Sequence, residues 1–175
     1  MVVCKKKNLQ AYNINFKQQT LKKMNSNQLK FIANKLQIQN FLGVFAVDEL
    51  SLLPMGSCGS LIFNTDTSEK KGQHWIAICL TANKIFYFDS LNVNFLFTSE
   101  VTKFLLRNKK ELFFNKIKTQ VDNSNTCGIH CLVFCLYMSK LDVKEKSFIT
   151  FFSNLLPFSV SQRESIMTST YYSII

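Results

Sequence analysis

One stretch of the chain decides the fold: Cys127-Gly-Ile-His-Cys-Leu-Val-Phe-Cys-Leu-Tyr-Met-Ser-Lys-Leu141. It is long enough for a helix and almost wholly apolar. A helix that is apolar on all sides must be buried, so we expect residues 127–141 to form the central helix of the molecule. The polar run Asp122–Thr126 before it should be exposed, which places Cys127 in the first turn of this helix.

Upstream of this helix, apolar runs rich in Ile, Phe and Tyr alternate with turn residues, which is typical of strands. We predict strands over Ser60–Asn64, His74–Leu80, Lys84–Asp89 and Phe114–Gln120. Further helices are expected over residues 27–38 with Ser26 as cap, over 95–114, and over 142–156 with Pro157 as stop. No element is assigned to the tail. The order predicts an α+β fold, a small mixed sheet with the central helix packed across it.

The bulk composition fits one globular domain, since 175 residues with 47% hydrophobic content can build a single core. We expect that domain over residues 25–175, after a basic and loosely packed N-terminal extension over residues 1–24. No apolar run reaches the roughly 18 residues of a membrane span, and no secretory signal follows the N-terminal charges. Six cysteines without a readable disulfide framework favour a reduced, intracellular protein, which we expect to be a monomer.

The formal net charge of +10 has two interpretations. Lysine clusters at residues 5–7, 22–23 and 109–110 would attract a polyanion, above all DNA, electrostatically and without sequence preference. However, Lys, Asn, Phe and Ile are all abundant and all have A+T-rich codons. A biased genome would supply the same lysines without selection for binding, and the sequence alone leaves both interpretations open.

Cys127 is the candidate nucleophile. A thiol attacks well only as the thiolate, and a helix start favours the thiolate through the helix dipole and unpaired N–H groups. Gly128 beside it leaves room for a substrate. Cys131 and Cys135 follow at helical spacing, as expected for side chains buried in the core. A purely structural role in the core is less consistent for Cys127, because the residues before it are polar.

Of the two histidines, His74 is the favoured base, because His130 lies on the same helix as Cys127 and points along its surface. We expect His130 to pack or hydrogen-bond under the sheet. Asp89 ends the strand after that of His74, where a carboxylate would orient the imidazole, although it could instead cap the next turn. Gln120 could donate an N–H to an oxyanion beside the backbone N–H of Cys127; a surface glutamine is the alternative that the residues alone favour.

A zinc site is not expected, although Cys127, His130, Cys131 and Cys135 lie close together in the sequence. Structural zinc sites draw pairs of ligands from two places in the chain. Four ligands spread over two turns of one helix cannot close a tetrahedron, so we predict no metal.

Taken together, these segments resemble the adenovirus endopeptidase (adenain) family of thiol proteases, most closely the variants of polinton/Maverick-type elements and related DNA viruses. The likeness runs from about Asn25 to Leu141 and keeps order and spacing. It rests on Gly43-Val-Phe, Asn64-Thr-Asp, Gly72-Gln-His74-Trp75, Phe88-Asp89-Ser90, Gln120 and Thr126-Cys127-Gly128-x-x-Cys131.

The resemblance implies a papain-like cysteine protease core in permuted order, with Cys127 as nucleophile, His74 as base, Asp89 as orienting group and Gln120 in the oxyanion hole. It also implies cleavage of viral or transposon-encoded structural precursors after small residues, as in capsid maturation, in the host nucleus or the assembling virion. Two alternatives stay open. One is a protease for ubiquitin-like modifiers, whose clan shares the His-Trp and Cys-Gly pieces, and the other is an inactive interaction module of the same fold.

Enzymes of the adenoviral family use viral DNA and a short basic peptide, attached through a disulfide, as cofactors. The cysteine that holds this peptide falls before the catalytic glutamine, and here residues 80–126 contain no cysteine. We therefore do not expect a disulfide-linked peptide cofactor. The residues require no cofactor, and stimulation by DNA is an expectation that rests on the charge.

Overall fold

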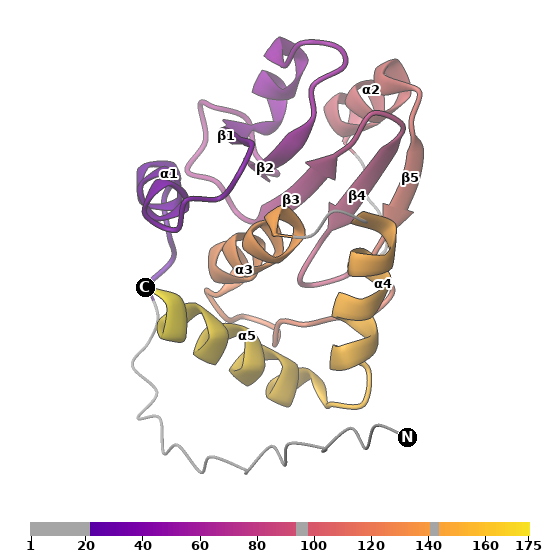
Figure 1. The fold of residues 1–175 in the computed structure, drawn as a ribbon. Helices are drawn as coiled ribbons and strands as arrows, with labels where there is room; N and C mark the ends of the chain where they lie inside the picture. Colours follow the sequence, from indigo (N-terminus) through magenta and orange to yellow (C-terminus); the bar gives the residue numbers. More distant parts are fainter. Residues whose placement is uncertain (1–21, 94–97, 141–143) are drawn as a thin grey trace, which may run out of the picture.

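The computed structural model describes residues 22–93, 98–140 and 144–175, which form a five-stranded mixed sheet covered by helices (Figure 1). The strand order follows the chain, and the strands are β1 (Phe41–Ala46), β2 (Gly59–Asn64), β3 (Trp75–Leu80), β4 (Lys84–Phe88) and β5 (Glu111–Phe114). The outer pairs β1–β2 and β4–β5 are parallel. The inner pairs β2–β3 and β3–β4 are antiparallel.

Helices cover both faces of the sheet. α3 lies across one face, with α1, α4 and α5 packed around it, and the 3-10 helix η1 and α2 cover the other face (Figure 1). Their bounds are α1 (Ser26–Lys35), η1 (Val47–Leu52), α2 (Ser99–Asn108), α3 (Cys127–Ser139), α4 (Lys144–Leu155) and α5 (Val160–Ile174). Within the described residues no helix is both long and apolar enough to cross a membrane.

The inner strands are apolar at almost every position because both faces are buried. On β4, Phe86 and Phe88 face the cluster around α3, whereas Ile85 and Tyr87 face the cluster around α2. Phe88 stacks on Phe134 of α3 with ring centroids 4.8 Å apart. This packing holds the helix across the sheet.

The predicted α+β fold is confirmed, and α3 begins at Cys127 as predicted. It extends to Ser139, and Leu141 lies outside the described residues. The prediction that Ser26 caps the first helix is wrong. The cap is Asn25, whose side chain accepts the N–H of Gln28, while the Gln28 side chain accepts the N–H of Asn25.

Two predictions between residues 95 and 120 are wrong. The helix predicted over 95–114, whose first residues lie outside the described part, is divided, because Lys109 takes a left-handed conformation (φ 50°) that ends α2. Glu111–Phe114 then pairs with β4 as a strand. The strand predicted over Phe114–Gln120 is instead a loop beyond Phe114.

The tail that the sequence left unassigned forms α5. Ser159 caps it with a capping box to Gln162, a pattern that could have identified the helix start. The helix returns beside α1, where the Lys35 ammonium donates to the carbonyl of Ile175. At the other end of the chain, the indole N–H of Trp75 donates to the carbonyl of Met24 at 2.9 Å, so Met24 is held to the domain.

We expect Gly59→Ala to lower the free energy of unfolding by more than about 3 kcal/mol. Gly59 has φ +143°, and an added Cβ would lie 2.0 Å from the carbonyl oxygen of Asn40, so strain and a backbone clash add. Gly56→Ala is the matched control, since Gly56 also has a positive φ (+79°) but nothing within 4 Å. It should cost only about 1–2 kcal/mol. Urea unfolding of both variants measures the difference, and equal losses would contradict the close approach at Gly59.

Candidate active site

The ends of three elements meet at one edge of the sheet. His74 directly precedes β3 and Asp89 directly follows β4. Because β3 and β4 are antiparallel, these two residues lie at the same end of the sheet. α3 packs on β3, so that its first residue, Cys127, lies beside His74. The sequence predictions for His74, Asp89 and Cys127 thus come together in space.

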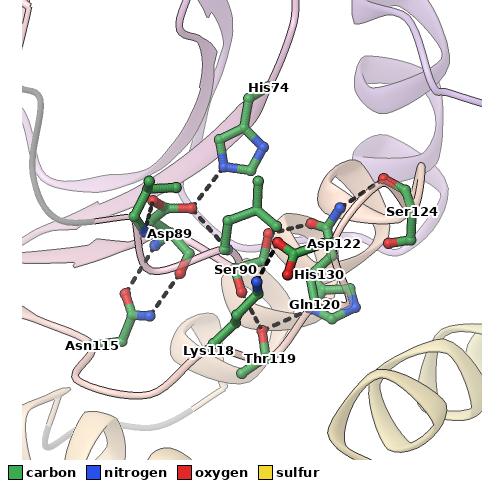
Figure 2. A network of polar contacts seen from close by, with 12 residues as sticks. His74, Asp89, Ser90, Asn115, Lys118, Thr119, Gln120, Asp122, Ser124 and His130 are labelled. Carbon is green, nitrogen blue, oxygen red and sulfur yellow. Dashed lines mark hydrogen bonds and ion pairs between the residues drawn. The ribbon is translucent and has the colours of Figure 1, made fainter. Parts of the chain in front are cut away.

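His74 and Asp89 form a short hydrogen bond. Nε2 of His74 lies 2.6 Å from Oδ1 of Asp89, and the two side chains are only 14% and 9% exposed (Figure 2). With Nε2 held by the carboxylate, Nδ1 is the ring nitrogen left for the thiol of Cys127. This is the arrangement that orients an imidazole and stabilises its charged form.

The carboxylate of Asp89 is itself held in place. It accepts the backbone N–H groups of Leu91 at 2.9 Å and Val93 at 3.2 Å. The buried side chain of Asn115 accepts the N–H of Asp89 at 2.9 Å and donates to its carbonyl at 2.7 Å (Figure 2). The reading of Asp89 as a mere turn cap is therefore incomplete. Asn115 was missed by sequence reasoning, because one asparagine after a phenylalanine run carries no distinguishing signal.

The two reactive groups shift each other toward the charged pair. Burial alone would lower the pKa of His74, but hydrogen bonds with Asp89 and Cys127 outweigh it and raise this pKa to about 9. Burial would likewise raise the pKa of Cys127, yet His74 and the backbone N–H groups of Trp75 and Gly128 lower it below the ordinary thiol value. Both shifts favour a thiolate beside an imidazolium over a neutral thiol beside a neutral imidazole.

Gln120 is buried and fixed, so the surface reading of this residue is wrong. Only 2% of it is exposed. The Ser90 hydroxyl donates to its Oε1 at 2.6 Å, and its Nε2 donates to the carbonyl of Ser124 at 2.9 Å (Figure 2). An amide nitrogen carries two N–H groups, so one remains after the bond to Ser124. The hydrogen bond from Ser90 fixes the position of the amide oxygen of Gln120. The amide nitrogen therefore faces the loop that leads to Cys127.

That loop is clamped by α5. One carboxylate oxygen of Glu164 accepts the N–H of Val121 at 3.2 Å, and the other accepts the hydroxyl of Thr126 at 2.5 Å. The same side chain thus holds both ends of the segment between Gln120 and Cys127. Beside it, the guanidinium of Arg163 donates to the carbonyl of Lys118 at 2.9 Å. The sequence offered no signal that Glu164 would meet this loop.

His130 does not compete with His74 as a base. It is fully buried on α3, and its Nδ1 lies 2.9 Å from the hydroxyl of Thr119. Burial, with the charge of His74 as a smaller cause, lowers its pKa to about 3, so it stays neutral. Cys131 and Cys135 are also fully buried, and burial raises the pKa of both thiols. Among the described residues, no group of three or more His, Cys, Asp or Glu side chains could hold a metal ion.

Comparisons with known proteins add a likeness of fold. No protein-family model and no curated protein matches the sequence. The structure is similar to the SUMO protease Ulp1 with its catalytic cysteine oxidized to a sulfinic acid, at a TM-score of 0.45 and 14% identity over 85% of this chain and 79% of that chain. It is also similar to an AvrA variant with IP6 and CoA, at a TM-score of 0.43 and 17% identity over 70% of this chain and 53% of that chain.

A third similar structure is an ASFV protease, with a TM-score of 0.34 and 20% identity over 52% of this chain and 38% of that chain. The chain thus spans about half the length of AvrA and less of the ASFV protein. At these scores and identities the likeness is one of outline, and the chemistry has to be derived from the site itself.

We expect the rate of alkylation of Cys127 by iodoacetamide to reach half its maximum at a lower pH than for an ordinary thiol, because the pKa of Cys127 is lowered. His74→Ala removes the imidazolium that stabilises the thiolate, so the midpoint should move to higher pH. Mass spectrometry of the peptide that contains Cys127 measures the rate at each pH. Cys4→Ser and Cys58→Ser in both proteins remove two competing thiols. The same midpoint with and without His74 would contradict the ion pair.

Proposed function

We propose that the chain is a cysteine endopeptidase with Cys127 as nucleophile, His74 as general base and acid, and Asp89 as the group that orients the imidazole. The observation that carries the proposal is the 2.6 Å bond of His74 to Asp89 beside a thiol of lowered pKa at a helix start. A structural cysteine buried in the core would have its pKa raised, as Cys131 and Cys135 do. Cys127 departs from them in the direction that a nucleophile needs.

The proposed reaction has two stages. The thiolate of Cys127 attacks the peptide carbonyl carbon, a C–S bond forms, and the carbonyl oxygen takes the negative charge. The imidazolium of His74 then protonates the leaving amine, the C–N bond breaks, and an acyl thioester remains. In the second stage His74 takes a proton from water, which attacks the thioester and releases the acid and the thiolate. Asp89 stabilises the imidazolium in both stages.

The oxyanion would be held by the backbone N–H of Cys127 and the second amide N–H of Gln120. Donors that are already in position when charge develops contribute more than donors that must reorganise. Three features support such a role for Gln120: its burial, the hydroxyl of Ser90 on Oε1, and the bond from Nε2 to Ser124. Ser90 would act as a positioning residue, because it prevents the amide from turning over.

For the substrate, we propose viral or transposon-encoded structural precursors, processed in the host nucleus or the assembling virion. The support is the sequence resemblance to the adenain family, carried by the motifs around His74, Asp89, Gln120 and Cys127. Non-specific stimulation by DNA is a separate proposal that rests on the net charge of +10. We propose no disulfide-linked peptide cofactor, because residues 80–126 contain no cysteine.

The decisive test is labelling with a thiol-reactive, activity-based probe, together with cleavage of a candidate precursor. Wild type should label at Cys127 and cleave, Cys127→Ala should do neither, and Cys131→Ala should do both. No labelling would favour an inactive interaction module. Reaction with a ubiquitin-like vinyl sulfone, without cleavage of capsid precursors, would assign the protein to modifier removal instead.

Gln120→Ala should lower kcat by about 10²–10³ with little change in KM, because the oxyanion forms only in the transition state. Alkylation of Cys127 should stay near the wild-type rate, since the thiolate depends on His74 and the helix start. Ser90→Ala should lower kcat by about tenfold, the effect of losing one orienting hydrogen bond. It should add nothing in the Gln120→Ala background. Equal loss of alkylation and turnover in Gln120→Ala would assign this residue to the thiolate or the fold.

A further inference from the structure

A basic hollow lies beside the candidate active site. It has a volume of about 390 Å³ and is bounded by the start of α1, the ends of β1 and β2, and the loop before β3. The buried side chains of Val44 and Trp75 are among the residues that line it. Four lysines line it: Lys23, Lys30, Lys70 and Lys71.

The side chain of Met24 lies between the hollow and Gly128, the residue that follows the nucleophile. Met24, which lines it, packs against Gly128: the Cβ of Met24 is 3.3 Å from the position that a Cβ on Gly128 would take. Trp75, which also lines the hollow, directly follows His74, and its indole N–H donates to the carbonyl of Met24. A peptide leaving Cys127 past these two side chains would enter the hollow.

Among the described residues that line the hollow, four lysines stand against one carboxylate, so positive charge is in excess. The ammonium group of Lys23 donates to the carbonyl of Gly72 at 2.7 Å. Within the described residues, the side chains of Lys30, Lys70 and Lys71 make no ion pair or hydrogen bond. The one carboxylate in the lining, Glu49, accepts the N–H of Ala46 at 2.6 Å. Like charges gathered in a concavity raise the potential above that of scattered surface lysines.

We propose that the basic hollow is a subsite for acidic side chains of the polypeptide substrate, a few residues from the scissile bond. The inference rests on the proposed endopeptidase function, since it takes Cys127 as the point where the peptide is cut. An extended peptide advances about 3.3 Å per residue, so its side chains reach the lysines soon after passing Met24. Because the hollow is lined by Met24, which packs against Gly128 next to the nucleophile, we expect its occupant to be the peptide that is cut and not DNA.

The test measures binding without catalysis. The Cys127→Ala protein is titrated into two fluorescein-labelled peptides. One carries Glu and Asp on the side of the cleavage site that faces the hollow, and the other carries Gln and Asn at the same positions. By fluorescence anisotropy at low salt, the acidic peptide should bind about tenfold more tightly, as expected for several exposed charge pairs. The preference should fall as salt is added.

Variants locate the effect. Lys30→Gln, Lys70→Gln and Lys71→Gln together should abolish the preference. The matched control is Lys103→Gln, Lys116→Gln and Lys146→Gln, exposed lysines outside the hollow, which remove the same charge and should keep the preference. Thermal unfolding checks that both triple variants are folded.

Three outcomes would overturn the inference: equal affinity for the two peptides, equal losses in both triple variants, or a hollow variant that loses affinity for duplex DNA but keeps the peptide preference. Cleavage by the wild type separates this inference from the proposed function. Cleavage without acidic preference refutes the subsite alone. An acidic preference without any cleavage refutes the endopeptidase and leaves a peptide-binding hollow.

Discussion

A helix without a polar side must be covered in every direction, and this constraint organises the molecule. α3 is buried from Cys127 to Leu136, with the sheet on one side and α1, α4 and α5 around the others. The sheet face toward α3 is apolar for this reason, and α2 and η1 cover the other face, so β3 and β4 are buried at nearly every position. At the start of α3 Cys127 is still buried, at 3% exposed, while most of the loop before it is exposed. Cys127 lies there, between a dry core and polar loops, and its thiol meets both the helix end and His74.

The electrostatics of the candidate site follow from that position. Burial by itself opposes both charges of a thiolate–imidazolium pair. The pair is favoured by directed hydrogen bonds: the imidazolium of His74 donates to Asp89 and to the thiolate of Cys127, and the thiolate also accepts from two backbone N–H groups. Asn115 holds the backbone of Asp89 through its buried amide. Asn115 thus helps to position Asp89, and Asp89 in turn positions the imidazole of His74.

A second layer of support comes from the end of the chain. Glu164 on α5 binds both ends of the loop before Cys127, while Ser90 after β4 binds the amide of Gln120. The loop that carries the proposed oxyanion donor is therefore held from two sides by elements far apart in the sequence. On the outer side, Met24 and Trp75 separate the nucleophile from the basic hollow. Met24 and Trp75 therefore border both the candidate active site and the proposed subsite.

Local patterns in the sequence were sufficient for the α+β class, for α3 and its start at Cys127, and for β2, β3 and β4. They also brought out His74 and Asp89, because each lies at an end of an apolar run, whereas the role of Gln120 was implied by the family resemblance and the residues alone favoured a surface glutamine. The end of α2 and the strand β5 could not be read, since a left-handed Lys109 and pairing with β4 override the helical pattern of residues 95–114. The burial of Gln120 and the parts played by Ser90, Asn115 and Glu164 depend on contacts between distant segments. A single polar residue forms no periodic pattern from which its contact partner could be predicted. Only the packed tertiary structure therefore decided the burial of Gln120 and these contacts.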